Sequence, residues 1–457
     1  MATTRRRFLE NALLLAASLI LPGPAEAAES ERLVAVVGAG LSGLAAALRL
    51  RQAGRRVVVL EAQGRSGGRV RTIRKGWSEG LHAEAGPTRI WDSHRATLRW
   101  ASELGLGLAP YEPADEAPLL ALGKSRFGAD EPCDRAVPTL SLRSDEKGLT
   151  ASQLLDRYAG ESAGADRLDW PAWLKARGAS DDAVSLITLG ADSRGLSSEF
   201  VLRQIALHRG SRKRFKLADG MEALPAALAD KLAGHIRYRC PVDGLRQDSR
   251  GVRVDYLAAG IPRSLRADRV ILAVPLPLAA LMRVTPALSQ AKTRAMAEVP
   301  YYAGTRILLQ SRSRFWSKAG LSGFARTDRP AELSHATFGQ AGTRGIVAVT
   351  LGGAAGEAAA SPRREEAVRL GLDAAAQAFP EIPREFETGE AVPWKADPWA
   401  RGAFPAWRPG QLSSIPDLAA PEGRVHFAGE HTSVWTSWME GALESGERAA
   451  AEVLKAG

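Results

Sequence analysis

The sequence predicts an α/β fold divided between at least two domains. Its 457 residues exceed what one hydrophobic core usually organises, and 45% of them are hydrophobic. A local pattern adds the fold class: a β-branched run at 33–37 leads into a glycine turn at 38–43, a helical stretch at 44–52 and a second apolar run at 57–60. This order is typical of a parallel sheet covered by helices. The 25% of charged residues excludes a polytopic membrane protein and a mostly disordered chain.

The first 27 residues predict an export signal rather than part of the fold. A basic head, Arg5-Arg6-Arg7-Phe8-Leu9, precedes an uncharged run at 11–21 and an Ala-Glu-Ala end at 25–27. The run is too short to span a bilayer, so no stable membrane insertion is expected. The paired arginines resemble a twin-arginine signal, with Glu10 where a lysine is common. We therefore expect a bacterial protein that is exported folded, and is periplasmic or secreted.

The glycine turn predicts a dinucleotide site of the Rossmann-like kind. Gly38 permits the tight turn, Gly40 lets the backbone approach a pyrophosphate, and Gly43 allows close packing of the helix. Leu41 and Ser42 begin that helix, whose N-terminal amides suit phosphate. Glu61 ends the second strand, at the distance expected for an acid that accepts from a ribose hydroxyl, and Ala62 follows it.

Residues 65–72, Arg-Ser-Gly-Gly-Arg-Val-Arg-Thr, indicate which dinucleotide binds. They resemble the R-x-G-G-R-x-x-T signature of the flavin-containing amine oxidase family, which includes monoamine, L-amino acid and polyamine oxidases. Further segments resemble this family in the same order along the chain, at 219–225, 239–242, 270–275, 427–432 and 438–450. The cofactor that the resemblance implies is FAD. Because Ala403 stands where monoamine oxidases carry a flavin-linked cysteine, noncovalent FAD is expected.

The resemblance also implies an architecture. An FAD-binding domain is expected from three segments, 32–90, 205–285 and 395–457, and a mixed-sheet plus helical substrate domain from 91–204 and 286–394. The stretch 91–204 itself reads as helical, without strand alternation. The family's cofactor contacts fall on Gly38, Gly40, Leu41, Ser42, Gly43, Glu61, Ala62, Arg69, Gly86, Pro87, Thr88, Arg89, Val242, Gly429, Glu430, Trp438 and Met439.

Arg89 is the candidate that decides the kind of substrate. It falls on the arginine that holds the substrate carboxylate in L-amino acid oxidases, although Thr88 and Trp91 depart from that pattern. A planar guanidinium suits a carboxylate, which an apolar flavin pocket would otherwise reject. Arg89 therefore favours an α-amino acid substrate.

Two aromatic residues are candidates for enclosing the amine. Phe404 and Trp438 fall on the family's aromatic pair and are expected to be both catalytic and substrate-binding, because they keep the amine dry. Trp399 and Trp407 lie nearby in the sequence, and core packing is the favoured interpretation for both.

Arg306 departs from the family pattern. It aligns with the lysine that holds a water against flavin N5, and it is the third candidate catalytic residue. An arginine stays protonated, so it cannot shuttle a proton as a lysine does. This casts doubt on fast reoxidation by oxygen.

The sequence is compatible with three functions. The first is L-amino acid oxidation, with hydride transfer to flavin N5 and a 2-oxo acid, ammonia and, with oxygen, hydrogen peroxide as products. The alternative is a periplasmic monoamine or polyamine oxidase or dehydrogenase that passes electrons to a cytochrome or quinone. A flavin-loaded binding protein without turnover is the third.

The remaining partners follow from composition. The net charge of +10 is spread along the chain, so no nucleic-acid partner is expected, and the scattered histidines predict no metal site. The expected partners are a small amine or amino acid and either oxygen or a redox protein. A homodimer, and a disulfide between Cys133 and Cys240, are left open.

Overall fold

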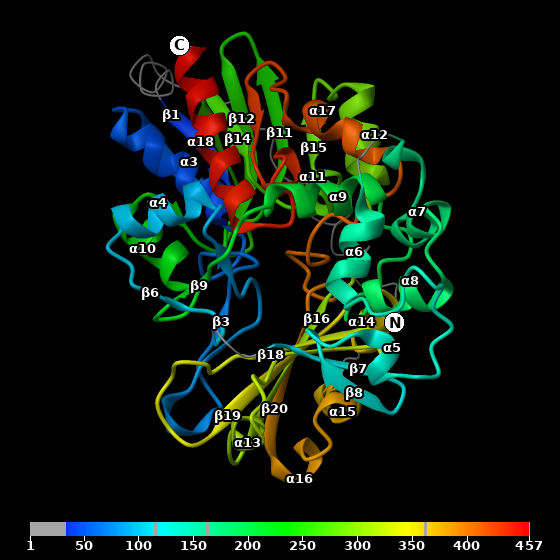
Figure 1. Ribbon diagram of the computed structural model, residues 1–457. Coiled ribbons are helices and arrows are strands. Elements are labelled where there is room, and N and C mark those ends of the chain that lie inside the picture. The colour runs from blue at the N-terminus through cyan, green and yellow to red at the C-terminus, as the bar shows by residue number, and fades with distance from the viewer. Residues whose placement is uncertain (1–32, 114–116, 161–163, 361–362, 457) are drawn as a thin grey trace.

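A computed structural model describes residues 33–113, 117–160, 164–360 and 363–456. The predicted signal at 1–27 lies outside these residues. A five-stranded parallel sheet occupies one end of the molecule (Figure 1), in the order β10-β2-β1-β14-β21. Its strands come from three distant parts of the chain: β1 (Leu33–Val37), β2 (Arg56–Leu60), β10 (Ile236–Arg237), β14 (Arg269–Leu272) and β21 (Val425–Phe427).

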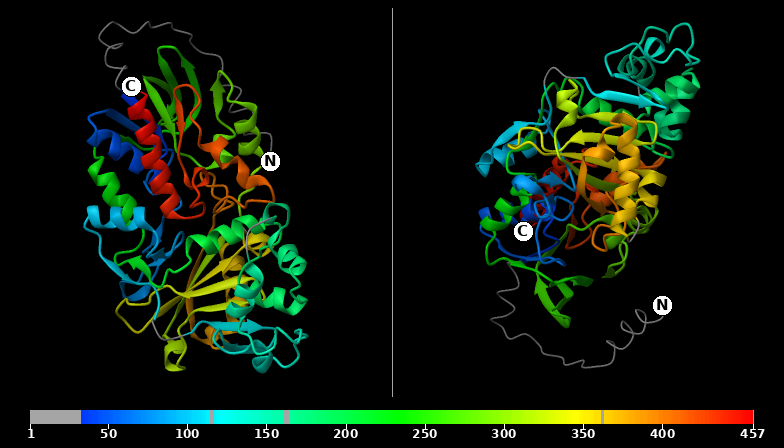
Figure 2. Two further views of the ribbon diagram at one scale, coloured as in Figure 1. Left: turned by 45° about the horizontal axis from the view of Figure 1, so that its top comes forward. Right: turned by 90° about the horizontal axis from the view of Figure 1, so that it is seen from below.

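The parallel sheet is buried on both faces because its strands are apolar throughout. Val34 and Val36 pack toward the helices α3 (Leu41–Gln52), α10 (Ala223–Lys231) and α18 (Met439–Lys455). Ala35 and Val37 pack toward a second sheet, whose strands are β11 (Val242–Asp248), β12 (Gly251–Ala258), β13 (Ile261–Ala267) and β15 (Arg283–Thr285). Figure 2 shows α18 running beside α3, so the two ends of the described chain close this unit together.

A seven-stranded sheet forms the other end of the molecule, in the order β20-β16-β19-β18-β17-β7-β8. Its strands are β7 (Leu119–Leu122), β8 (Ser125–Gly128), β16 (Thr305–Ser311), β17 (Ala325–Thr327), β18 (Ala331–His335), β19 (Gly345–Leu351) and β20 (Phe386–Pro393). Helix α15 (Arg364–Ala378) packs against one face (Figure 2), where it meets Ile307 and Leu309. The opposite face carries Arg306 and Leu308, because strand side chains alternate.

Short helices flank the seven-stranded sheet on one side (Figure 1). They are α5 (Cys133–Ala136), α6 (Ala151–Ala159), α7 (Trp170–Ala176), α8 (Asp181–Ile187) and α9 (Ser198–Leu207). The prediction that 91–204 lacks strands is wrong, because β6 (Leu108–Pro110), β7 and β8 fall within it. These strands are only three or four residues long, too short for an alternating pattern to stand out in the sequence.

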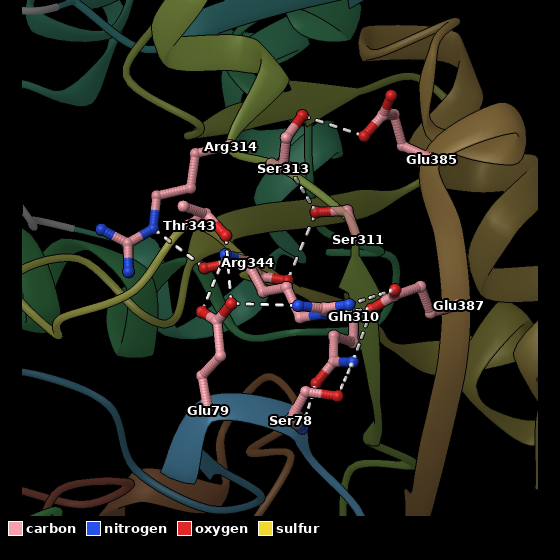
Figure 3. Close-up of polar contacts among 11 residues, drawn as sticks. Ser78, Glu79, Gln310, Ser311, Ser313, Arg314, Thr343, Arg344, Glu385 and Glu387 are labelled. Atoms are coloured by element: carbon pink, nitrogen blue, oxygen red, sulfur yellow. Dashed lines mark hydrogen bonds and ion pairs between the residues drawn. The ribbon is translucent and has the colours of Figure 1, made fainter.

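A polar network joins the loop at 74–82 to the seven-stranded sheet (Figure 3). Arg344 is its centre and donates to Glu79 at 3.0 Å and to Glu387 at 2.8 Å. Gln310 on β16 accepts from the Ser78 backbone at 2.8 Å and donates to Glu387 at 2.8 Å. The network therefore connects a loop that follows the glycine motifs to strands more than 200 residues later in the chain.

The predicted fold class is confirmed. A Rossmann-like parallel sheet built from three segments is combined with a mixed sheet and a helical region. The domain boundaries themselves stay a prediction. Among the described residues, no helix has the length and apolar character needed to cross a bilayer. Cys133 and Cys240 are both free and buried, each in a different hydrophobic cluster.

Candidate active site

One cavity of about 1650 Å³ runs from the glycine turn after β1 to the seven-stranded sheet. It exceeds the roughly 300–1,000 Å³ typical of a site for one small ligand. Its walls include the turn at Gly38 and Gly40, the aromatic residues Phe404 and Trp438, and Arg306 on β16. A single connected space thus has room for a dinucleotide and a second, smaller molecule.

The glycine-turn end has the features of a phosphate site. Helix α3 begins after Gly40, and no side chain caps its N-terminus, so its first amides remain available. A Cβ built on Gly40 would meet no atom within 4 Å, so space lies open directly above the turn. The N-terminus of α18, at Trp438 and Met439, also lacks a side-chain cap and lines the same cavity. These two helix ends suit the phosphate and flavin ends of FAD, so the residues present fit the cofactor.

Two other glycines in this region serve packing. A Cβ on Gly43 would lie 2.0 Å from the Gly38 carbonyl oxygen, and one on Gly86 would lie 2.0 Å from the Arg69 carbonyl oxygen. Of the predicted cofactor residues, Gly43 is the one that does not line the cavity. It supports the site by allowing close packing of the helix. Gly86 does line the cavity.

Glu61 holds the glycine turn in place as well as facing the cavity. Its carboxylate accepts from the Ala39 and Gln63 backbone amides, both at 2.7 Å. Burial raises the pKa of Glu61, and these amide hydrogen bonds act in the opposite direction. The carboxylate retains lone pairs for a ribose hydroxyl.

Arg69 is tied to Glu430, another predicted cofactor residue. The guanidinium donates to the Glu430 carboxylate at 2.9 Å and to the Ala403 carbonyl at 2.8 Å. The second Glu430 oxygen accepts from the Thr436 hydroxyl at 3.0 Å and from the Ser437 amide at 2.8 Å. The pair therefore joins the early glycine motif to the C-terminal segment and neutralises the Arg69 charge within the protein.

Arg89 lines the substrate end of the cavity but already has a carboxylate partner. Its Nη1 donates to Glu332 Oε1 at 2.7 Å. The Arg89 guanidinium, with the nearby Arg326 and Arg306, lowers the pKa of Glu332 to about 2, and Glu332 in turn raises the pKa of Arg89. Arg89 Nε is buried without an acceptor among the described residues, so the Nε side of the guanidinium is still available.

Arg306 lies in a polar row on the cavity face of the seven-stranded sheet. Cross-strand pairing places Arg306, Thr350, Glu332 and Arg326 side by side on β16, β19, β18 and β17. Arg306 donates to the Thr350 hydroxyl at 2.6 Å and to the Gly86 carbonyl at 3.2 Å. Both partners are neutral, and burial lowers the pKa of Arg306. Arg306 lines the cavity, and its match to the family's lysine stays a prediction.

The aromatic residues lie in three different settings. Phe404 and Trp438 both line the cavity, and Phe404 stacks on Tyr302 with ring centroids 4.9 Å apart. Trp407 is fully buried and donates to Thr436, as expected of core packing. The core prediction for Trp399 is wrong, because its side chain is 37% exposed and lines the cavity. Trp399 sits in a turn held by Asp397, which leaves its ring uncovered.

Most of the predicted site residues meet in this cavity. Those that line it are Gly38, Gly40, Leu41, Ser42, Glu61, Ala62, Arg69, Gly86, Pro87, Thr88, Arg89, Val242, Arg306, Phe404, Gly429, Glu430, Trp438 and Met439. The sequence did not indicate Glu332, Tyr111 or Gln204, which also line it. No motif marks them, since strand pairing and helix packing bring them there.

The family is decided by a match along nearly the whole chain. Residues 41–454 match the model of the flavin containing amine oxidoreductase family. The chain belongs to this family. It is therefore an oxidoreductase that acts on CH–NH2 groups, with a flavin cofactor.

Individual relatives cover most of the chain as well. The L-amino-acid oxidase of Siganus canaliculatus is 31% identical, with 92% of this chain and 85% of the relative aligned. L-amino acid oxidase Bs29 of Bothriechis schlegelii is 29% identical, with 94% and 92% aligned. Among solved structures, cyclohexylamine oxidase from Brevibacterium oxydans IH-35A is 25% identical with a TM-score of 0.78, covering 93% of this chain and 99% of that chain.

Proposed function

We propose that this flavoenzyme oxidises the C–N bond of L-α-amino acids, giving a 2-oxo acid and ammonia. The observation that supports the proposal most is the charge at the substrate end of the cavity. Arg89 and Arg306 both line it, and Glu332, which pairs with Arg89, is the carboxylate near them. One positive charge is left over, which matches one substrate carboxylate.

In this proposal, each side chain has a defined part. Arg89 offers its Nε side to the carboxylate, and Glu332 holds the other side of the guanidinium. Phe404 and Trp438 form apolar walls that exclude water from the amine. Bound FAD supplies the acceptor for the hydride that leaves the α-carbon. The amine must be neutral at that point, and the cationic surroundings of Arg89 and Arg306 favour its deprotonation.

The mode of FAD binding and the cellular location are also proposals. Ala403 lies on the cavity wall, and its methyl side chain has no atom that bonds to a flavin, so FAD is held without a covalent link there. The basic, then apolar, N-terminal sequence supports export to the periplasm or outside the cell, by the twin-arginine route. Oxygen would be the electron acceptor of an oxidase, with hydrogen peroxide as its product.

An Arg89→Met variant tests the carboxylate part of the proposal. Loss of a charge-assisted hydrogen bond of roughly 1.5–3 kcal/mol should raise the KM for amino acids about 10- to 100-fold. Flavin content and thermal melting show whether the variant is folded. An unchanged KM for amino acids would overturn the proposal.

A second function, amine oxidation or dehydrogenation, is favoured by the Arg89–Glu332 pair itself. The 2.7 Å contact neutralises the arginine, and Glu332 presents a carboxylate that suits a cationic amine or polyamine. Arg306, in place of a lysine, would fit a cytochrome or quinone acceptor in this case. Rapid reoxidation of the reduced enzyme in air would count against that acceptor.

A further inference from the structure

Gln204 on α9 contacts the predicted cage residue Trp438 and lines the cavity. The Trp438 indole N–H donates to Gln204 Oε1 at 2.5 Å. An indole nitrogen can only donate, so the oxygen of the amide must be the atom that faces it. This contact fixes the amide orientation, and the Gln204 NH2 group has to point elsewhere.

The NH2 group of Gln204 has no acceptor in the described part of the chain. Gln204 Nε2 is buried, as is Arg89 Nε, and neither forms a hydrogen bond there. The Arg89 guanidinium carbon lies 5.8 Å from the centre of the Trp438 ring. Two buried donors without acceptors thus border the same tryptophan on the wall of one cavity. Such donors are costly to bury, so an acceptor supplied by a ligand in the cavity would stabilise them.

A pair of histidines packs against Trp438 and contacts the backbone of Gln204. His208 Nδ1 lies 2.8 Å from the backbone carbonyl oxygen of Gln204, and His208 Nε2 lies 3.1 Å from His94 Nε2. Burial lowers the pKa of both, that of His94 to about 3, so both rings are neutral. His208 then donates through Nδ1 and accepts from His94. Their rings pack on Trp438 with centroids 4.8 and 4.9 Å away.

We propose that Gln204 is a substrate-recognition residue, whose amide N–H donates to the substrate carboxylate together with Arg89. This inference rests on the proposed function, since it requires a carboxylated substrate. The acceptor that it identifies is an oxygen of that carboxylate. Trp438 is then both a wall for the amine and the anchor that aims the Gln204 amide.

The Gln204→Glu variant tests the inference in the flavin-loaded enzyme. The oxygen that accepts from Trp438 is kept, while the NH2 group becomes an oxygen that repels a carboxylate. Each amino acid is compared with the amine that lacks only its carboxylate. We expect kcat/KM to fall about 30-fold or more for amino acids and to change no more than about 3-fold for the amines. Gln204→Met, which removes the donor without adding charge, should give a smaller loss of about 3- to 10-fold for amino acids.

Ala206→Glu provides the matched control, because Ala206 is an exposed residue on the same helix. It adds the same charge to α9 outside the cavity and should leave both substrate classes unchanged. Binding of 3-phenylpropionate, a carboxylate without an amine, gives a readout independent of turnover. Its affinity, followed by calorimetry, should fall in Gln204→Glu and stay unchanged in Ala206→Glu.

The outcomes separate this inference from the proposed function. If Gln204→Glu lowers turnover of amino acids and amines alike, the residue only positions Trp438 and the inference is wrong. If Arg89→Met weakens binding of amino acids and 3-phenylpropionate but neither Gln204 variant does, the inference fails while the proposed function stands. If Arg89→Met changes neither, the proposed function fails and takes the inference with it.

Discussion

At the scale of single residues, Glu332 controls how much positive charge Arg89 offers to a ligand. Its carboxylate is held to Arg89 at 2.7 Å and is ionised across the physiological range, since its pKa is lowered to about 2. Glu332 thus has two opposing effects on the binding of an anionic substrate. It orients the guanidinium of Arg89, which favours binding, and it offsets the positive charge of Arg89, which weakens binding.

Glu332→Gln separates these effects because the amide oxygen still accepts from Arg89 Nη1. With the negative charge removed, the affinity for 3-phenylpropionate should rise about 3- to 10-fold. Glu112→Gln is the control, because Glu112 pairs with Arg214 near Arg89 and does not line the cavity. Weaker binding in Glu332→Gln would show that the charge of Glu332 supports anion binding instead.

The buried carboxyl of Glu84 should make the free energy of unfolding depend on pH. Burial raises its pKa from 4.5 to about 7, and it accepts from the Met221 amide at 3.0 Å and the Thr72 hydroxyl at 2.9 Å. The folded protein therefore binds a proton more tightly than the unfolded chain, so this group's contribution to stability falls as pH rises from about 4.5 to about 7. Glu84→Gln should remove that fall, measured as urea unfolding from pH 5 to 8. An equal difference between variant and parent at pH 5 and pH 8 would contradict it.

Site residues could be predicted from the sequence where a motif contains them, but their contacts with other side chains could not. Arg89 and Arg306 were placed in one site from short sequence patterns, and both line the cavity. Glu332 was missed because its place beside Thr350 depends on the pairing of β18 with β19. Gln204 was missed because helix α9 carries no motif, and only tertiary packing brings it to Trp438.

At the scale of elements, two glycines of the β1–α3 motif have different physical roles: Gly40 lies in the turn after β1, and Gly43 lies in the first turn of α3. Gly43 has no room for a side chain, since a Cβ would lie 2.0 Å from the Gly38 carbonyl oxygen. Gly40 has a φ of −71°, which any residue adopts, and free space within 4 Å. Gly43 therefore supports the fold, and Gly40 leaves room for the cofactor.

Alanine at each position distinguishes the two roles. Gly43→Ala should lower the melting temperature of the protein with flavin removed, because the helix must move away from the strand. Gly40→Ala should leave that temperature within about 2 °C and weaken FAD binding, measured by titration. Equal effects of the two substitutions on melting and on FAD affinity would contradict this division.

Element prediction worked where the pattern was long enough to read. The β-branched strand, turn and helix at 33–52 agree with β1 and α3. The strands β6 to β8 were missed because each has only three or four residues and is defined by its partners in the sheet.

At the scale of the whole molecule, the Arg344 network links the loop at 74–82 to the seven-stranded sheet (Figure 3). Hydrogen bonds from Arg344 lower the pKa of Glu79 and of Glu387. The two ionised carboxylates therefore stabilise the folded protein above about pH 4.5, the ordinary pKa of a glutamate. This stabilisation is lost as the pH falls below that value.

Arg344→Gln should lower the melting temperature at pH 7, with a smaller difference from the parent at pH 3.5 and in 1 M salt. Lys175→Gln, which removes an isolated surface pair with Asp181, is the matched control and should have little effect. A difference that is the same at both pH values would mean that the ionised carboxylates are not the source of the stabilisation.

The fold brings the glycine-turn end and the arginine-lined end into one cavity of about 1650 Å³, in which we propose that amino acids are oxidised. The most direct measurement is anaerobic bleaching of the bound flavin, with each amino acid tested beside the amine that lacks only its carboxylate. We expect amino acids to bleach the flavin and their amines to do so at least about tenfold more slowly, with the difference lost in Arg89→Met. Faster bleaching by the amines than by the amino acids would contradict the account.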